Sequence, residues 1–146
     1  YVPIGMGSGA CAAIAAKLAL NHRARVVGVV STLATTYPDS IAAGRVVEAP
    51  VTTQIADGMA VRLADPSALA VLSEHLDHIV QVSDEEVAAA MCAIYEDTHN
   101  VAEGAGAAAF AAAMQEKAQL KGLKVGAALT GGNVDAPVFA KVLGGN

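Results

Sequence analysis

At 146 residues, the chain is long enough to form one domain with a substantial buried core, and 54% of its residues are hydrophobic. Its formal charge of -5 at pH 7 argues against a nucleic-acid surface. No apolar run has the length of a membrane span or the pattern of a signal peptide, which favours a cytoplasmic protein without nucleic-acid or membrane partners. The two cysteines, Cys11 and Cys92, have no metal-ligand spacing and indicate no disulfide framework.

The first predicted elements are a buried strand that starts at Tyr1, a glycine-rich turn and a helix over Ala10–Leu20. The residues of the turn are Gly5, Met6, Gly7, Ser8 and Gly9. Glycines remove the Cβ atoms that would keep the backbone away from a ligand. The free amides of such a turn and of the helix start favour an anion, and the serine adds a hydroxyl donor. We therefore predict that this turn is a phosphate-binding cradle.

Two alternatives for the glycine-rich turn stay open. The glycines could serve only a tight connection between strand and helix, or Gly5, Gly7 and Ala10 could belong to the dinucleotide fingerprint G-x-G-x-x-G/A. That fingerprint requires an acid at the end of the next strand. The strand predicted at Arg25–Val30 is followed by Ser31-Thr32-Leu33-Ala34, with neither an acid nor an arginine for a 2′-phosphate. The dinucleotide interpretation is therefore weakly supported.

Strands and helices alternate along the rest of the chain. Further strands are predicted at 77–82 and 124–129, and helices at 65–76, 84–97, 104–120 and 135–143. Ser83 and Glu86 form a capping box at the start of the second of these helices. The segment 31–57 has no sustained period and holds only a short helix near 40–43. This order predicts a single α/β domain over 1–146, with a mainly parallel sheet and helices on both faces.

Ligands of parallel sheets bind beyond the carboxyl ends of the strands. Two predicted loops lie there, Gly5–Gly9 after the first strand and Thr130–Asn133 after the last. They are far apart in sequence, and we expect them to face one another across one site.

Four motifs occur together in a specific order. They are Pro3-Ile4-Gly5-Met6-Gly7-Ser8-Gly9, Ile55-Ala56-Asp57-Gly58, Val101-Ala102-Glu103-Gly104-Ala105-Gly106-Ala107 and Thr130-Gly131-Gly132-Asn133. With these motifs the chain resembles the threonine/serine dehydratases, which are fold-type-II pyridoxal-phosphate-dependent enzymes. The resemblance covers essentially the whole chain, and within the family it is greatest to the branch that contains ectoine-utilisation dehydratases.

The resemblance implies a lyase of amino-acid metabolism that uses pyridoxal 5′-phosphate to convert a hydroxy amino acid into a keto acid and ammonia. It places the cofactor phosphate at Gly5–Gly9, the pyridine nitrogen at Thr130, and the ring near Glu103 and Gly58. Thr130, Glu103 and Gly58 each have an alternative interpretation without a ligand. Thr130 and Gly58 could be ordinary turn residues, and Glu103 could be an acid favoured by the dipole at a helix start.

Two departures from the family pattern bear on chemistry. Ser31 stands where some members have a metal-binding glutamate, so we expect no metal site. The family's Schiff-base lysine precedes the cradle, and no such lysine is in this chain, so we expect no catalytic residue here. The five lysines are expected on helices or near strand starts, at positions 17, 117, 121, 124 and 141.

The chain is thus expected to be the C-terminal portion of the large domain of a longer enzyme, inactive alone. The resemblance implies a homodimer in full-length form and a small amino-acid substrate. A β-replacement enzyme of the same fold and a non-catalytic module for phosphate-bearing ligands remain as alternatives.

Overall fold

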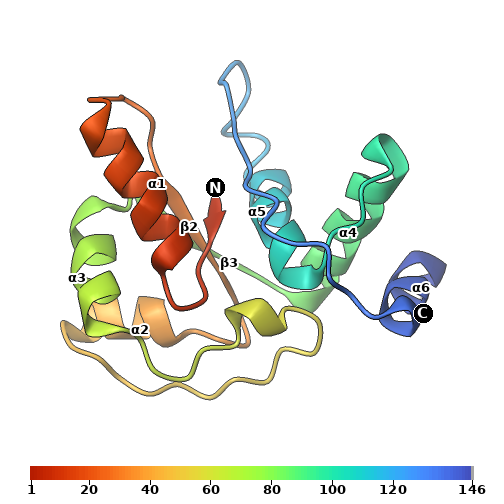
Figure 1. The fold of residues 1–146 in the computed structure, drawn as a ribbon, viewed down its shortest axis with the longest axis horizontal. Helices are drawn as coiled ribbons and strands as arrows, with labels where there is room; N and C mark the ends of the chain where they lie inside the picture. The colour runs from red at the N-terminus through yellow and green to blue at the C-terminus, as the bar shows by residue number, and fades with distance from the viewer. Residues whose placement is uncertain (146) are drawn as a thin grey trace.

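A parallel three-stranded sheet forms the centre of the molecule in the computed structural model, which describes residues 1–145 (Figure 1). The strands are β1 (Val2–Pro3), β2 (Val27–Ser31) and β3 (His78–Val82), paired in the order β1-β2-β3. Every residue of β2 is buried, as expected for a strand that is covered on both faces. The predicted α/β class with a parallel sheet is confirmed.

Two hydrophobic clusters cover the two faces of the sheet. Val27 and Val29 of β2 belong to one cluster, and Val30 belongs to the other, because successive strand residues point to opposite faces. The helices around the sheet are α1 (Ser8–Ala19), α2 (Thr36–Ala43), α3 (Pro66–His75), α4 (Asp84–Thr98) and α5 (Gly104–Gln115). Helices α1 and α3 lie on one side, and α4 and α5 lie on the other (Figure 1).

The helix starts follow local sequence signals. Asp65 caps α3 by accepting a hydrogen bond of 2.8 Å from the Ala68 N–H, and Pro66 occupies the first turn. Ser83 and Glu86 form the predicted capping box of α4, with both reciprocal hydrogen bonds present. These predictions are confirmed. Helix α5 is different, because its buried residues are all glycine and alanine, which lets its backbone approach the sheet and the neighbouring loops closely.

The prediction of a strand at 124–129 is wrong, because the structure has no regular strand there. Gly126 accepts a hydrogen bond of 2.8 Å from the Tyr1 amino group, and the Ala128 N–H donates one of 3.0 Å to the Tyr1 carbonyl. This pattern is that of one parallel pairing beside β1. All residues from Lys124 to Leu129 except the half-buried Ala128 are exposed, so packing does not extend the ladder further.

Two helix boundaries also differ from the prediction. Helix α5 ends at Gln115 instead of residue 120, because the residues that follow leave the buried cluster and form turns. Helix α2 spans Thr36–Ala43 and is longer than the short helix expected there, since Thr36 and Tyr37 are buried.

The last helix, α6 (Ala136–Gly144), packs beside α4 (Figure 1). No helix within residues 1–145 has the length and apolar character needed to cross a membrane.

His78, at the start of β3, joins two carboxylates. Its Nδ1 lies 2.8 Å from Asp77 Oδ2, and its Nε2 lies 3.0 Å from Glu116 Oε1, just after α5. Burial lowers the pKa of His78, but the hydrogen bonds to Asp77 and Glu116 outweigh this and raise the pKa above its usual 6.5. These two contacts tie the end of α5 to the start of β3.

This contact predicts a pH-dependent stability. A histidine with a raised folded-state pKa stabilises fully below its unfolded pKa, and this stabilisation is lost as pH rises through the folded pKa. The free energy of unfolding should therefore fall as pH rises from about 6.5 towards the raised pKa. Urea denaturation of the wild type and of His78→Gln at several pH values checks this, because the fall should be absent in the variant. An identical pH profile for both proteins would contradict it.

Candidate functional site

The glycine-rich turn presents free backbone donors. Gly7 has φ +97°, a left-handed conformation, and is the N-cap of α1 without any side-chain hydrogen bond to the cap. The first intrahelical bond runs from the Cys11 N–H to the Gly7 carbonyl at 2.9 Å. The amides of Ser8, Gly9 and Ala10 precede this bond and have no acceptor inside the helix. With no acid in the first turn, this end of α1 favours an anion.

The turn after residue 129 packs directly on the backbone at the start of α5. The Glu103 N–H donates a hydrogen bond of 3.0 Å to the Gly131 carbonyl. A Cβ on Gly106 would collide with the same carbonyl oxygen, and one on Gly132 would lie 2.5 Å from the Val101 oxygen. Gly106 in α5 and Gly132 in the turn are therefore both needed for this close backbone contact. The contact fixes the position of Thr130.

The short 3-10 helix at Asp57–Met59 lies between the cradle and α5. A Cβ on Gly5 would collide with the Gly58 carbonyl oxygen, and a Cβ on Gly58 would lie 2.8 Å from the Ala105 Cβ. A Cβ on Gly104 would collide with the Ile55 carbonyl oxygen. Three segments that are distant in sequence are thus brought into backbone contact.

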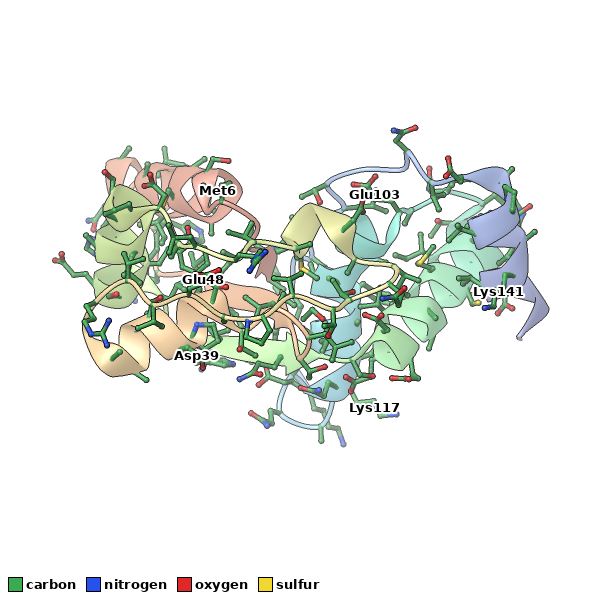
Figure 2. The ribbon with its side chains drawn as sticks, turned by 90° about the horizontal axis from the view of Figure 1, so that it is seen from below. Met6, Asp39, Glu48, Glu103, Lys117 and Lys141 are labelled. Atoms are coloured by element: carbon green, nitrogen blue, oxygen red, sulfur yellow. The ribbon has the colours of Figure 1, made fainter. Side chains whose placement is uncertain are left out.

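These segments surround a cavity of about 270 Å³. Its lining residues are Pro3, Gly5, Met6, Gly7, Ser8, Gly9, Gly58, Met59, Glu103, Ala105 and Thr130. All eight residues predicted for the site line this one cavity, so the two loops expected to face one another do so. Thr130 and Ser8 are exposed, and Glu103 is half-buried. In Figure 2, Met6 and Glu103 lie in the upper half of the view, just before the first residues of α1 and α5.

None of the lysines within residues 1–145 lines the cavity. Lys17 lies in the last turn of α1, Lys141 lies in α6, and the other three follow α5. Figure 2 shows Lys117 and Lys141 away from both Met6 and Glu103.

Ser31, the residue predicted to replace a metal ligand, is fully buried at the end of β2. Its Oγ accepts a hydrogen bond of 3.1 Å from the Leu33 N–H. In the described part of the chain, no three His, Cys, Asp or Glu side chains are grouped so that they could hold a metal ion.

Tyr37 does not line the cavity, but it contacts the cradle from behind, and sequence reasoning missed it. Its hydroxyl donates a hydrogen bond of 2.6 Å to the carbonyl of Met6, the second residue of the cradle. Burial raises the pKa of this phenol, so the hydroxyl stays protonated as a donor. The residue lies in the segment 31–57, which has no periodicity. The one available signal was a large aromatic side chain in a chain that is only 3% aromatic.

The family described as "Pyridoxal-phosphate dependent enzyme" matches residues 1–131. The chain belongs to this family. The predicted resemblance is thereby confirmed at the level of the family, and the α/β fold of this chain is a pyridoxal-phosphate-enzyme fold.

Named relatives support the same family. A relative from Geobacter sulfurreducens, "L-threonine ammonia-lyase", is 34% identical over 143 residues, which are 97% of this chain and 35% of the relative. A relative from Saccharomyces cerevisiae, "L-threo-3-hydroxyaspartate ammonia-lyase", is 30% identical over 145 residues, 99% of this chain and 44% of the relative. The solved structure of processed threonine deaminase isoform 2 from Solanum lycopersicum superposes with a TM-score of 0.88 at 26% identity, over 97% of this chain and 42% of that one. The chain therefore spans less than half the length of these relatives.

The cavity of this chain fits the phosphate of a pyridoxal phosphate cofactor. The amides at the start of α1 are donors without helical acceptors, and a helix N-terminus favours a doubly charged phosphate. Gly5, Gly7 and Gly9 all line the cavity, and without side chains they leave the backbone of this wall accessible to a ligand.

Proposed function

We propose that the full-length protein is a pyridoxal-phosphate-dependent ammonia-lyase that converts a threonine- or serine-like hydroxy amino acid into a keto acid and ammonia. The observation that carries this proposal is the cavity in which the glycine-rich cradle, Glu103 and Thr130 meet. Membership of the family and the names of two ammonia-lyase relatives support it.

In this proposal the residues of the chain bind and orient the cofactor. Amides of Gly5–Gly9 and the Ser8 hydroxyl hold the phosphate, the Thr130 hydroxyl binds the ring nitrogen, and Glu103 and Gly58 flank the ring. When bound, pyridoxal phosphate supplies an electron sink for the substrate. A neutral threonine at the ring nitrogen would make the cofactor a weaker electron sink than a carboxylate would. A weaker sink suits loss of a β-hydroxyl better than it suits racemisation or transamination.

In this proposal, other parts of the full-length enzyme lie outside residues 1–146. We propose that residues 1–146 are the C-terminal portion of a large α/β domain, and that the Schiff-base lysine and the residues that grip the substrate side chain belong to other parts. We also propose a cytoplasmic homodimer for the full-length protein. Membership of the ectoine-utilisation branch stays a prediction.

Variants of Thr130 in the full-length enzyme test the proposal. Thr130→Ala should retain the cofactor through its phosphate and lower turnover about tenfold, on the scale of one lost hydrogen bond. Thr130→Asp should protonate the ring nitrogen and raise the share of racemised or transaminated product. The measurements are the dissociation constant of pyridoxal phosphate, turnover, and the ratio of products from L-threonine and L-serine.

Thr52→Ala is the matched control, because Thr52 is an exposed threonine that does not line the cavity. It should leave affinity, turnover and product ratio unchanged. A wild type that releases no ammonia from either substrate would contradict the lyase. Such a protein that still binds pyridoxal phosphate would be a β-replacement enzyme or a binding module instead.

A further inference from the structure

We infer that Tyr37 is a positioning residue that holds the Gly5–Gly9 cradle in its phosphate-binding conformation. This inference rests on the proposed function of the cavity. Tyr37 lies on α2, which does not line the cavity, so its effect on a ligand is exerted through the cradle backbone.

The hydrogen bond from Tyr37 fixes one peptide unit of the cradle. Tyr37 is 2% exposed, and its hydroxyl donates to the Met6 carbonyl at 2.6 Å. The Met6 carbonyl and the Gly7 N–H belong to the same planar trans peptide and point in opposite directions. Since the carbonyl points to the buried phenol, the Gly7 N–H points away from the core. The phenol therefore sets the direction of an amide at the centre of the predicted anion site.

The same hydroxyl connects the cradle to a second helix. It accepts a hydrogen bond of 3.4 Å from the N–H of Asp65, which in turn caps α3. Gly7 packs against this arrangement, because a Cβ there would lie 2.7 Å from the Ala68 Cβ and 3.0 Å from the Tyr37 hydroxyl. The left-handed conformation of Gly7 is thus held between α3 and the phenol.

No other side chain holds the cradle in the same way. Within residues 1–145, the hydrogen bond from Tyr37 is the one side-chain hydrogen bond to the backbone of residues 5–9, and the N-cap of α1 has no side-chain partner. Without the hydroxyl, the peptide between Met6 and Gly7 could rotate, and its amide would no longer be aimed at the ligand. The cradle would then lose affinity for phosphate while the surrounding fold persists.

Tyr37→Phe in the full-length protein tests this inference, because it removes the hydroxyl and keeps the buried ring. The readouts are the dissociation constants of pyridoxal 5′-phosphate and of pyridoxal, which lacks the phosphate, and the urea midpoint of unfolding. Tyr37→Phe should weaken binding of pyridoxal 5′-phosphate by about tenfold, the scale of one hydrogen bond, and leave pyridoxal within about twofold.

Thr36→Val is the matched control. Thr36 is the neighbouring residue of α2, is 1% exposed, and donates its own hydrogen bond to the Val61 carbonyl, away from the cradle. It should lower the urea midpoint to a similar degree and leave both affinities unchanged. A purely structural role would instead give Tyr37→Phe and Thr36→Val the same affinities.

The outcomes separate this inference from the proposed function. If the wild type prefers pyridoxal 5′-phosphate to pyridoxal and Tyr37→Phe keeps that preference, the positioning role is overturned and the proposed function stands. If the wild type itself shows no preference for the phosphate form, the cofactor site fails, and the role of Tyr37 fails with it.

Discussion

Gly7→Val is expected to abolish binding of pyridoxal phosphate to the cradle, with affinity reduced more than a hundredfold. Gly7 has φ +97°, where a β-branched residue is strongly disfavoured. Its Cβ would also lie 2.7 Å from the Ala68 Cβ, so the loop would have to move away from α3. Such a movement would turn the amides of the following residues away from the phosphate. The measurement is the dissociation constant of pyridoxal 5′-phosphate.

Gly44→Val provides the control for backbone strain. Gly44 also has a positive φ, +65°, but a Cβ there would meet no atom within 4 Å, and the residue lies at the end of α2 away from the cavity. Both variants should lose some stability, and only Gly7→Val should lose the ligand. Equal affinity in wild type and Gly7→Val would remove the cradle from the proposed site.

Gly106→Ala is expected to destabilise the protein by about 1–3 kcal/mol, the usual range for overpacking. Alanine is favoured over glycine inside a helix by about 1 kcal/mol, so helix propensity alone predicts the opposite sign. The Cβ would collide with the Gly131 carbonyl oxygen and push the turn that carries Thr130 away from α5. Urea denaturation measures the change, and binding of pyridoxal phosphate should weaken in parallel.

Gly126→Ala is the comparison for this variant, because a Cβ at Gly126 would meet no atom within 4 Å. It should leave both stability and affinity close to those of the wild type. A stabilised Gly106→Ala would show that the turn and α5 are not in the close contact described above.

Local patterns predicted most of the fold. The capping box at Ser83 and Glu86, the Asp65-Pro66 start of α3 and the apolar run of β2 are decided by neighbouring residues, and the structure agrees with each. The strand at 124–129 failed because its formation depends on a partner, and within residues 1–145 it pairs through its backbone with Tyr1 alone. An extended apolar sequence alone does not say whether a second strand is available.

The site residues were accessible to sequence reasoning for a different reason. A Cβ at Gly5 or Gly106 would clash with the backbone of another segment, and one at Gly58 or Gly131 would clash with the side chain of Ala105 or Glu103. The motifs therefore reflect packing between segments distant in sequence. Tyr37 was not accessible, because its hydrogen bond to Met6 joins residues 31 positions apart and leaves no mark on local periodicity. The structure was therefore needed to find the hydrogen bond by which Tyr37 holds the cradle.

The most direct test of the proposed site is a titration of the 146-residue chain with pyridoxal 5′-phosphate, followed by the backbone amide shifts of the assigned protein. We predict saturable shifts in Gly5–Gly9, Gly58 and Thr130, and no shifts in Gly5–Gly9 when pyridoxal replaces the phosphate form. Lys117 and Lys121 line a separate groove beyond α5 and offer amines to which an aldehyde could add. Shifts confined to that groove, with Gly5–Gly9 unchanged, would contradict the cofactor site.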